Sequence, residues 1–153
     1  MNLSEIEFVD RMGLTMERLG GTRTMGRLYA WLMICDPPDR SLTDLAAELG
    51  VSKTSVSTVA RQLELSGMVE RAPASTREHH YRMVGGGWAQ VMRVQPAVVK
   101  QSLDTLDFGL SILGDDRPGR RGRLEDTREF FAFILRDSDE MFERWREYRE
   151  KSS

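Results

Sequence analysis

The chain has 153 residues, of which 40% are hydrophobic and 30% charged, and its formal net charge is -2. This composition is typical of an ordinary globular domain and excludes a chain that is basic throughout, so any phosphate contact requires a local basic surface. The single cysteine, Cys35, excludes an intramolecular disulfide, and no apolar run approaches the ~20 residues that span a bilayer.

The first 34 residues predict two helices that support the core and contribute to a dimer. Apolar residues recur at helical spacing from residue 3 to residue 19. Either Thr22 or Thr24 can cap the next helix, which ends at Asp36-Pro37 because proline lacks an amide donor. The acidic N-terminus lacks the basic start of a signal peptide, so we expect a cytoplasmic protein.

Residues 42 to 71, LTDLAAELGVSKTSVSTVARQLELSGMVER, contain two short helical patterns separated by a tight turn. Ser41 stands three residues before Asp44, which is a capping-box variant that opens the first helix. Gly50 can adopt the left-handed conformation that ends a helix, and Ser52 can cap the next one. This order is typical of a helix-turn-helix, whose second helix can lie in the DNA major groove.

The second of these helices has an apolar side and a polar side. At ~100° per residue, the apolar side collects Val56, Val59, Ala60 and Leu63. The polar side carries short hydroxyls and two bases, which can contact phosphates and base edges. The predicted DNA-binding residues of this segment are Ser52, Lys53, Thr54, Ser55, Ser57, Thr58 and Arg61. The alternative is an ordinary solvated helix face, which the turn, the cap and the following segment disfavour.

Residues 68 to 84 predict a β-hairpin wing. Val69 and Arg71 begin an extended segment, residues 73 to 76 are turn-like, and residues 79 to 84 can form the return strand. Arg77 is expected at the tip, where it could enter the minor groove or clamp a phosphate; the alternative is a solvated loop arginine. Residues 52 to 63 and 71 to 77 each hold two bases and no acid. We therefore expect a winged helix-turn-helix domain over residues 40–85.

Residues 86–153 predict a helical dimerisation region. A helical segment over residues 88 to 113 should bend or restart at Pro96. The last helix, from about residue 123 to 150, carries a seam of apolar residues at seven-residue spacing that exceeds what one winged helix needs to cover. We expect this region to form a homodimer together with the first helix; the alternative is packing on its own chain alone.

The chain resembles the MarR superfamily of winged-helix regulators, and its GbsR-like branch in particular. The matching segments are EFVDRMG, MGRLYAWLMI, residues 42 to 71, and REHHYRMV followed by Trp88, so the resemblance covers roughly residues 5 to 92. It implies a mainly α dimer with a small β wing on each subunit and transcriptional control, usually repression that a small molecule relieves. By position it implies that residues 52 to 58 and Arg61 face DNA, with Arg77 in the wing. The chain departs from the pattern because the wing lacks a tip glycine and because Gly85–Gly87 could loosen the following link.

The same resemblance implies a small-molecule effector. Some GbsR-like proteins sense quaternary ammonium compounds, which aromatic cages hold by cation–π attraction. The residues that could line such a pocket are Trp31, Tyr81, Trp88 and Phe108. Their alternative role, as ordinary hydrophobic core, is the commoner one for aromatic residues.

Neither an enzyme nor a metal or cofactor site is expected. Cys35, His79 and His80 offer no zinc spacing and no nucleophile–base arrangement. Cys35 follows an apolar helix and is expected to be a small core residue. The sequence thus predicts a homodimeric, sequence-specific regulator that binds double-stranded DNA at a near-palindromic operator and has no membrane partner. The alternatives are a winged helix used only for protein contacts and a regulator that senses redox state through Cys35.

Overall fold

The computed structural model describes residues 1–73, 77–93, 95–113 and 118–152. The chain divides into two compact units, Met1–Val91 and Met92–Ser153, and each is described by itself. Among the described residues, no helix is both long and apolar enough to cross a membrane.

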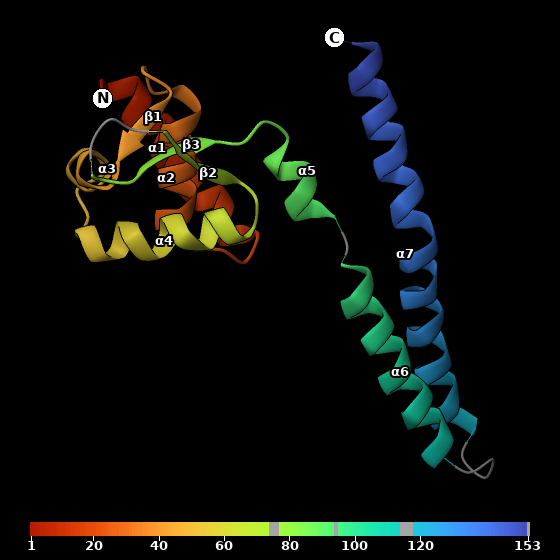
Figure 1. Ribbon diagram of the computed structural model, residues 1–153. Coiled ribbons are helices and arrows are strands. Elements are labelled where there is room, and N and C mark those ends of the chain that lie inside the picture. Colours follow the sequence, from red (N-terminus) through yellow and green to blue (C-terminus); the bar gives the residue numbers. More distant parts are fainter. Residues whose placement is uncertain (74–76, 94, 114–117, 153) are drawn as a thin grey trace. The chain divides into compact units, whose positions relative to one another are not determined.

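The first unit is mainly helical and carries a small antiparallel sheet (Figure 1). Its elements are α1 (Leu3–Arg18), α2 (Arg23–Ile34), β1 (Asp39–Ser41), α3 (Leu42–Leu49), α4 (Lys53–Leu65), β2 (Val69–Ala72) and β3 (His80–Met83). α5 (Gly87–Met92) crosses the boundary, and α6 (Pro96–Ile112) and α7 (Pro118–Lys151) form the second unit. The predicted fold class, mainly α with a small β wing, is confirmed.

Proline divides the helical segment predicted over residues 88 to 113. α5 ends at Met92, and α6 restarts with Pro96 at its first position. A proline is tolerated there because the amide of that position has no partner inside the helix. The predicted restart is therefore confirmed, whereas the last helix begins at Pro118, earlier than predicted.

The sheet contains a third strand that the sequence analysis did not predict. The strand order is β1-β3-β2, and both pairings are antiparallel, with Arg40 opposite Tyr81 and Arg71 also opposite Tyr81. β1 has only three residues and follows two prolines, so it shows no alternation that a pattern could detect. Ser41 ends this strand and also caps α3, which couples the sheet to the helix-turn-helix.

The core of the first unit is built from α1 to β3 and includes Leu28, Tyr29, Leu45 and Leu63. α1 and α2 cross at a glycine contact. A Cβ atom on Gly26 would lie 2.4 Å from the carbonyl oxygen of Met12 and 2.8 Å from the Cα of Gly13. Because those neighbours are backbone atoms, the two helices can approach this closely only without a side chain at Gly26.

Gly87 of the glycine triplet is buried at a close contact. A Cβ atom there would lie 2.9 Å from the Cα of Met68, at the start of the segment that leads into the wing. Gly86 has a φ of 81°, which favours glycine. Gly87 of the triplet therefore allows the start of α5 to pack closely against Met68.

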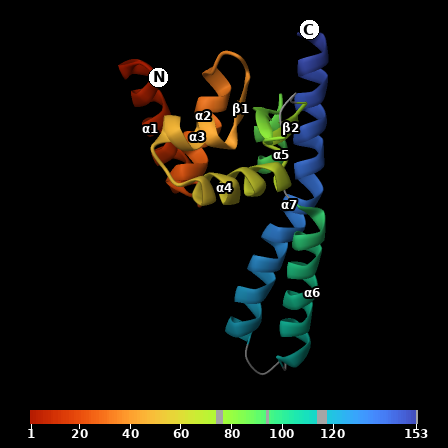
Figure 2. The same ribbon diagram turned by 60° about the vertical axis from the view of Figure 1, so that its left-hand side comes forward.

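The second unit consists of α6 and α7, which lie side by side (Figure 2). Asp107 of α6 accepts hydrogen bonds from the Nε and Nη2 groups of Arg128 in α7. Among the described residues of this unit, only Val99 and Ser138 are buried. Its exposed large apolar side chains are Met92, Val98, Phe108, Ile112, Phe130, Phe133, Met141, Trp145 and Tyr148.

Candidate nucleic-acid interface

The turn before α4 is held by local contacts. Gly50 ends α3 with φ 65° and ψ 34°, in the left-handed region. The Ser52 hydroxyl oxygen accepts a hydrogen bond from the backbone N–H of Ser55 at 3.1 Å and so caps α4. Ser41 caps α3 in the same way, through the N–H of Asp44 at 3.0 Å. The predicted roles of Gly50 and Ser52 are confirmed. Ser41 caps α3 as predicted, but its hydroxyl donates to the Asp44 carboxylate, which is not the reciprocal bond of a capping box.

α4 separates an apolar face from a polar face. Its buried residues are Val56, Val59, Ala60 and Leu63, as the spacing predicts. In both views α4 lies along one edge of the first unit (Figures 1 and 2). The predicted DNA-binding residues Ser55 and Ser57 are half-buried, and the exposed ones are Ser52, Lys53, Thr54, Thr58 and Arg61. The first turns of α4 thus present short polar side chains to the solvent.

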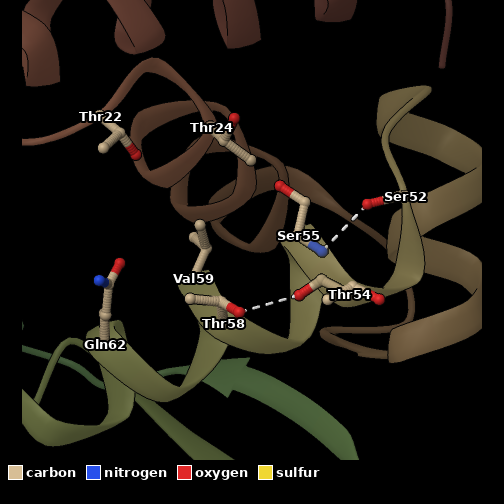
Figure 3. Close-up of a pocket in the computed structure, with 8 residues that line it drawn as sticks. All are labelled: Thr22, Thr24, Ser52, Thr54, Ser55, Thr58, Val59 and Gln62. Carbon is tan, nitrogen blue, oxygen red and sulfur yellow. Dashed lines mark hydrogen bonds between the residues drawn. The ribbon is translucent and has the colours of Figure 1, made fainter.

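An open hollow with a volume of about 500 Å³ lies between the start of α2 and α4 (Figure 3). We call it the hydroxyl-lined hollow; its residues are Thr22, Thr24, Ser52, Thr54, Ser55, Thr58, Val59 and Gln62. The Thr22 oxygen accepts from the N–H of Met25, and the Thr58 hydroxyl donates to the carbonyl of Thr54. Within the part of the chain that the structure describes, the Thr24 and Ser55 hydroxyls have no protein partner, so they can bind an incoming polar group.

Sequence reasoning considered Thr22 and Thr24 only as helix caps and did not consider Gln62. The threonines precede α4 by many residues, and no local pattern connects the two segments. Their approach depends on how α2 packs against α4, which is a property of the folded core.

Lys53, the first residue of α4, belongs to a cluster that we call the Lys53 cluster and that also contains Thr43 of α3 and Glu78 before β3. The Lys53 ammonium lies 2.9 Å from Oε1 of Glu78 and donates to the Thr43 hydroxyl at 2.7 Å. The Thr43 hydroxyl and backbone N–H both donate to the same Glu78 oxygen. These hydrogen bonds, the Thr43 hydroxyl first and Lys53 second, lower the pKa of Glu78 to about 2. The carboxylate is therefore charged at neutral pH.

Some of the other basic residues of the interface form ion pairs with acidic residues, and others do not. Arg71 pairs with Glu64 and Arg82 pairs with Glu70, at 3.2 and 2.6 Å. Within the described residues, Arg61 and Arg77 are exposed and form no ion pair. These two guanidinium groups are therefore the bases most readily available to a phosphate or a base edge.

The wing is tied to β1 at its base. Nδ1 of His80 lies 2.7 Å from Oδ2 of Asp39, between strands β3 and β1, whereas His79 is exposed. Residues 74–76, which the sequence analysis placed in the turn, lie outside the described residues. Arg77 follows them directly, so the structure shows its exposure and its position next to Glu78.

The four aromatic residues predicted to line an effector pocket have different surroundings. Trp31 and Tyr81 are buried in the core, and Trp88 packs edge-on against Tyr29 with ring centroids 5.8 Å apart. Phe108 is exposed on α6, in the second unit. Trp31, Tyr81 and Trp88 therefore pack as core residues, which was the alternative role. The effector pocket stays a prediction.

The Cys35 thiol is buried beside the end of α2. Burial raises its pKa, so the reactive thiolate is scarce at neutral pH. Among the described residues, no three His, Cys, Asp or Glu side chains gather where they could hold a metal ion. Neither observation supports redox or metal chemistry at this surface.

The sequence is similar to known regulators over both units. Residues 32–78 match the model of the MarR family, and residues 86–148 match the model described as MmpR5-like MarR family transcriptional regulator. The HTH-type transcriptional regulator MmpR5 of Mycobacterium tuberculosis is 37% identical over 130 residues, covering 84% of this chain and 79% of that protein. A crystal structure described as that of a transcriptional regulator is 34% identical, covers 94% of this chain and 99% of its own, and has a TM-score of 0.77.

Proposed function

We propose that this chain, which belongs to the MarR family of DNA-binding transcriptional regulators, represses transcription as a homodimer on a near-palindromic operator. The observation that carries this proposal is α4. Its apolar face is buried, and its exposed face presents short hydroxyls and Arg61, which has no ion pair among the described residues. A helix with small residues at its start can enter a major groove because the backbone then approaches the base edges closely.

In this proposal the two grooves and the backbone meet different parts of the first unit. α4 lies in the major groove, where Arg61 pairs with a base or a phosphate. The hydroxyl-lined hollow faces the sugar–phosphate backbone beside α4, where Thr24 and Ser55 donate hydrogen bonds. Arg77 contacts the flanking backbone or the minor groove. Hydroxyl contacts to phosphates position the protein without selecting a sequence, so in this proposal sequence selection falls mainly to Arg61.

The homodimer is proposed from the second unit. Nine of the large apolar side chains that the structure describes in this unit are exposed, and such surfaces commonly mark interfaces between proteins. Two-fold symmetry then requires two half-sites about one helical turn, ~10 base pairs, apart. A cytoplasmic location is part of the same proposal. Control by a small-molecule effector and membership of the GbsR-like branch stay predictions, whereas the family match is to MmpR5-like regulators.

The test is the selection of bound duplexes from a random pool, followed by binding measurements at several salt concentrations. We expect an enriched near-palindrome and an affinity that falls steeply as salt rises, because phosphate contacts release counterions. A pool without an enriched palindrome contradicts the specific regulator. Binding to no duplex at any salt concentration would instead favour a winged helix used for protein contacts.

Arg61→Ala and Arg77→Ala resolve the two proposed contacts. If Arg61 reads a base, Arg61→Ala costs about 1–3 kcal/mol on the operator and relaxes the selection at one base pair of each half-site. A loss that is equal on all duplexes assigns Arg61 to a phosphate instead. Arg18→Ala, which removes an exposed arginine of α1, is the matched control and should leave the affinity unchanged.

A further inference from the structure

Lys53 stands at the start of the proposed reading helix, and its charge is already matched by an acid of the same chain. Two of its three ammonium protons are engaged, one by the Glu78 carboxylate at 2.9 Å and one by the Thr43 hydroxyl at 2.7 Å. The Lys53 side chain is nevertheless 60% exposed, whereas that of Glu78 is 32% exposed. Lysine therefore lies on the outside of the pair, where a solvent-borne anion can reach it.

The carboxylate of Glu78 has the chemistry of a phosphate at this position. A single oxygen, Oε1, accepts from the Lys53 ammonium, from the Thr43 hydroxyl and from the Thr43 backbone N–H. An ammonium, a hydroxyl and an amide are the donors that proteins use for DNA phosphates. A negative group is also favoured there because the N-terminal end of the α4 dipole is positive. Glu78 thus satisfies, inside the protein, the group that would otherwise attract a phosphate.

We propose that Glu78 is an intramolecular competitor for Lys53, and that a DNA backbone phosphate gains the full attraction of the Lys53 charge only by displacing the Glu78 carboxylate. This inference rests on the proposed function, since it concerns how the same surface binds DNA. Lys53 exchanges one anionic partner for another on binding, so it contributes little net affinity in the native chain. Glu78 thereby limits the sequence-independent part of the affinity and leaves base reading by α4 with a larger share of the total.

Glu78→Gln tests the proposal with little disturbance of the fold. The amide oxygen of glutamine can still accept from the Thr43 N–H and hydroxyl, so the contact between the wing and α3 is kept while the charge is lost. We expect the variant to bind duplex DNA about two- to fivefold more tightly, the range that one exposed ion pair commands. The gain should be similar on the selected operator and on a scrambled duplex of the same length. A thermal melt of each variant verifies that the fold is retained.

A double-mutant cycle separates release of Lys53 from the general removal of a negative charge. Affinities of the native chain, Glu78→Gln, Lys53→Met and the double variant are measured by fluorescence anisotropy. The proposal requires the gain from Glu78→Gln to disappear when Lys53 is replaced, because the released ammonium is then absent. Glu7→Gln provides the matched control, since it removes an acid from an exposed ion pair with Arg11 on α1, and it should leave the affinity unchanged.

Three outcomes overturn the proposal. An unchanged or weaker affinity of Glu78→Gln makes Glu78 a structural tie between the wing and α3. An equal gain with and without Lys53 means that Glu78 repels DNA at a distance and does not compete for Lys53. A gain that Glu7→Gln reproduces means that net charge alone is responsible. Failure of the native chain to bind any duplex refutes the proposed function, a result that is distinct from all three.

Discussion

In the first unit Leu28, Tyr29 and Leu45 are almost completely buried, whereas in the second unit Phe108, Phe130 and Trp145 stay exposed. Both units are helical and contain similar kinds of apolar residue. They differ because the first unit packs four helices and a sheet around one core, whereas the second unit is built from the two helices α6 and α7. Two helices cannot cover the apolar side chains on all of their faces. The comparison teaches that the first unit is stabilised by its own core and the second requires a further surface.

The largest expected effect is that of Gly26→Ala, which tests how closely α1 and α2 pack in the core of the first unit. The new Cβ would meet the carbonyl oxygen of Met12 and the Cα of Gly13, which are backbone atoms that cannot move aside. We expect a loss of about 3 kcal/mol or more in the free energy of unfolding, the upper end of overpacking effects. Chemical denaturation followed by circular dichroism measures it. A variant as stable as the native chain would show that α1 and α2 do not cross as closely as described.

Trp145→Glu tests whether the exposed apolar side chains of the second unit are buried against a second copy of the chain. If Trp145, which stacks on Tyr148, lies in a dimer interface, the variant should raise the dissociation constant of the dimer about thirtyfold or more, equivalent to about 2 kcal/mol. Sedimentation equilibrium over a range of concentrations measures this. Leu65→Glu, at an exposed leucine of α4, is the control and should leave the oligomeric state unchanged. Equal behaviour of the two variants would remove Trp145 from the interface.

Gly122→Ala should stabilise the protein, whereas Gly26→Ala should destabilise it. Gly122 lies inside α7, and a Cβ there has no neighbour within 4 Å. Alanine should therefore stabilise the helix by about 0.5–1 kcal/mol, because glycine loses more backbone entropy on folding. The thermal midpoint of the second unit should rise. A decrease would indicate that another chain approaches Gly122 closely.

The smallest effect concerns the ion pair between α6 and α7. Hydrogen bonds from Arg128 lower the pKa of Asp107 below its ordinary value of 3.8. A lowered folded-state pKa means that the pair stabilises the unit above pH 3.8 and that this stabilisation is lost as pH falls through the lowered value. Asp107→Asn should thus melt below the native chain at pH 7, and the gap should close in acid. A gap that does not shrink as the pH falls below 3.8 would assign the effect to packing.

The sequence predicted the features that neighbouring residues determine. Gly50 and Ser52 act within one turn, and the buried side of α4 follows from the helical period, so both were found. β1 was missed because three residues carry no period. The ion pair of Lys53 was missed because Glu78 lies one residue beyond a stretch, residues 71 to 77, whose only charged residues are bases. Pairs between distant residues depend on the folded backbone, and local charge counts do not reveal them.

The third strand connects α4 and the wing, the two parts of the first unit that we propose to contact DNA. Ser41 ends β1 and caps α3, while β1 pairs with β3 at the base of the wing. Because α3 leads through the turn at Gly50 into α4, β1 links the base of the wing to the helix that we propose to read DNA. Under the proposed function, the protein then responds to the spacing between its two contacts as well as to the bases they read. On an operator with one base pair inserted between the major-groove site and the wing site, the two contacts would no longer form together, even though every base they read is still present.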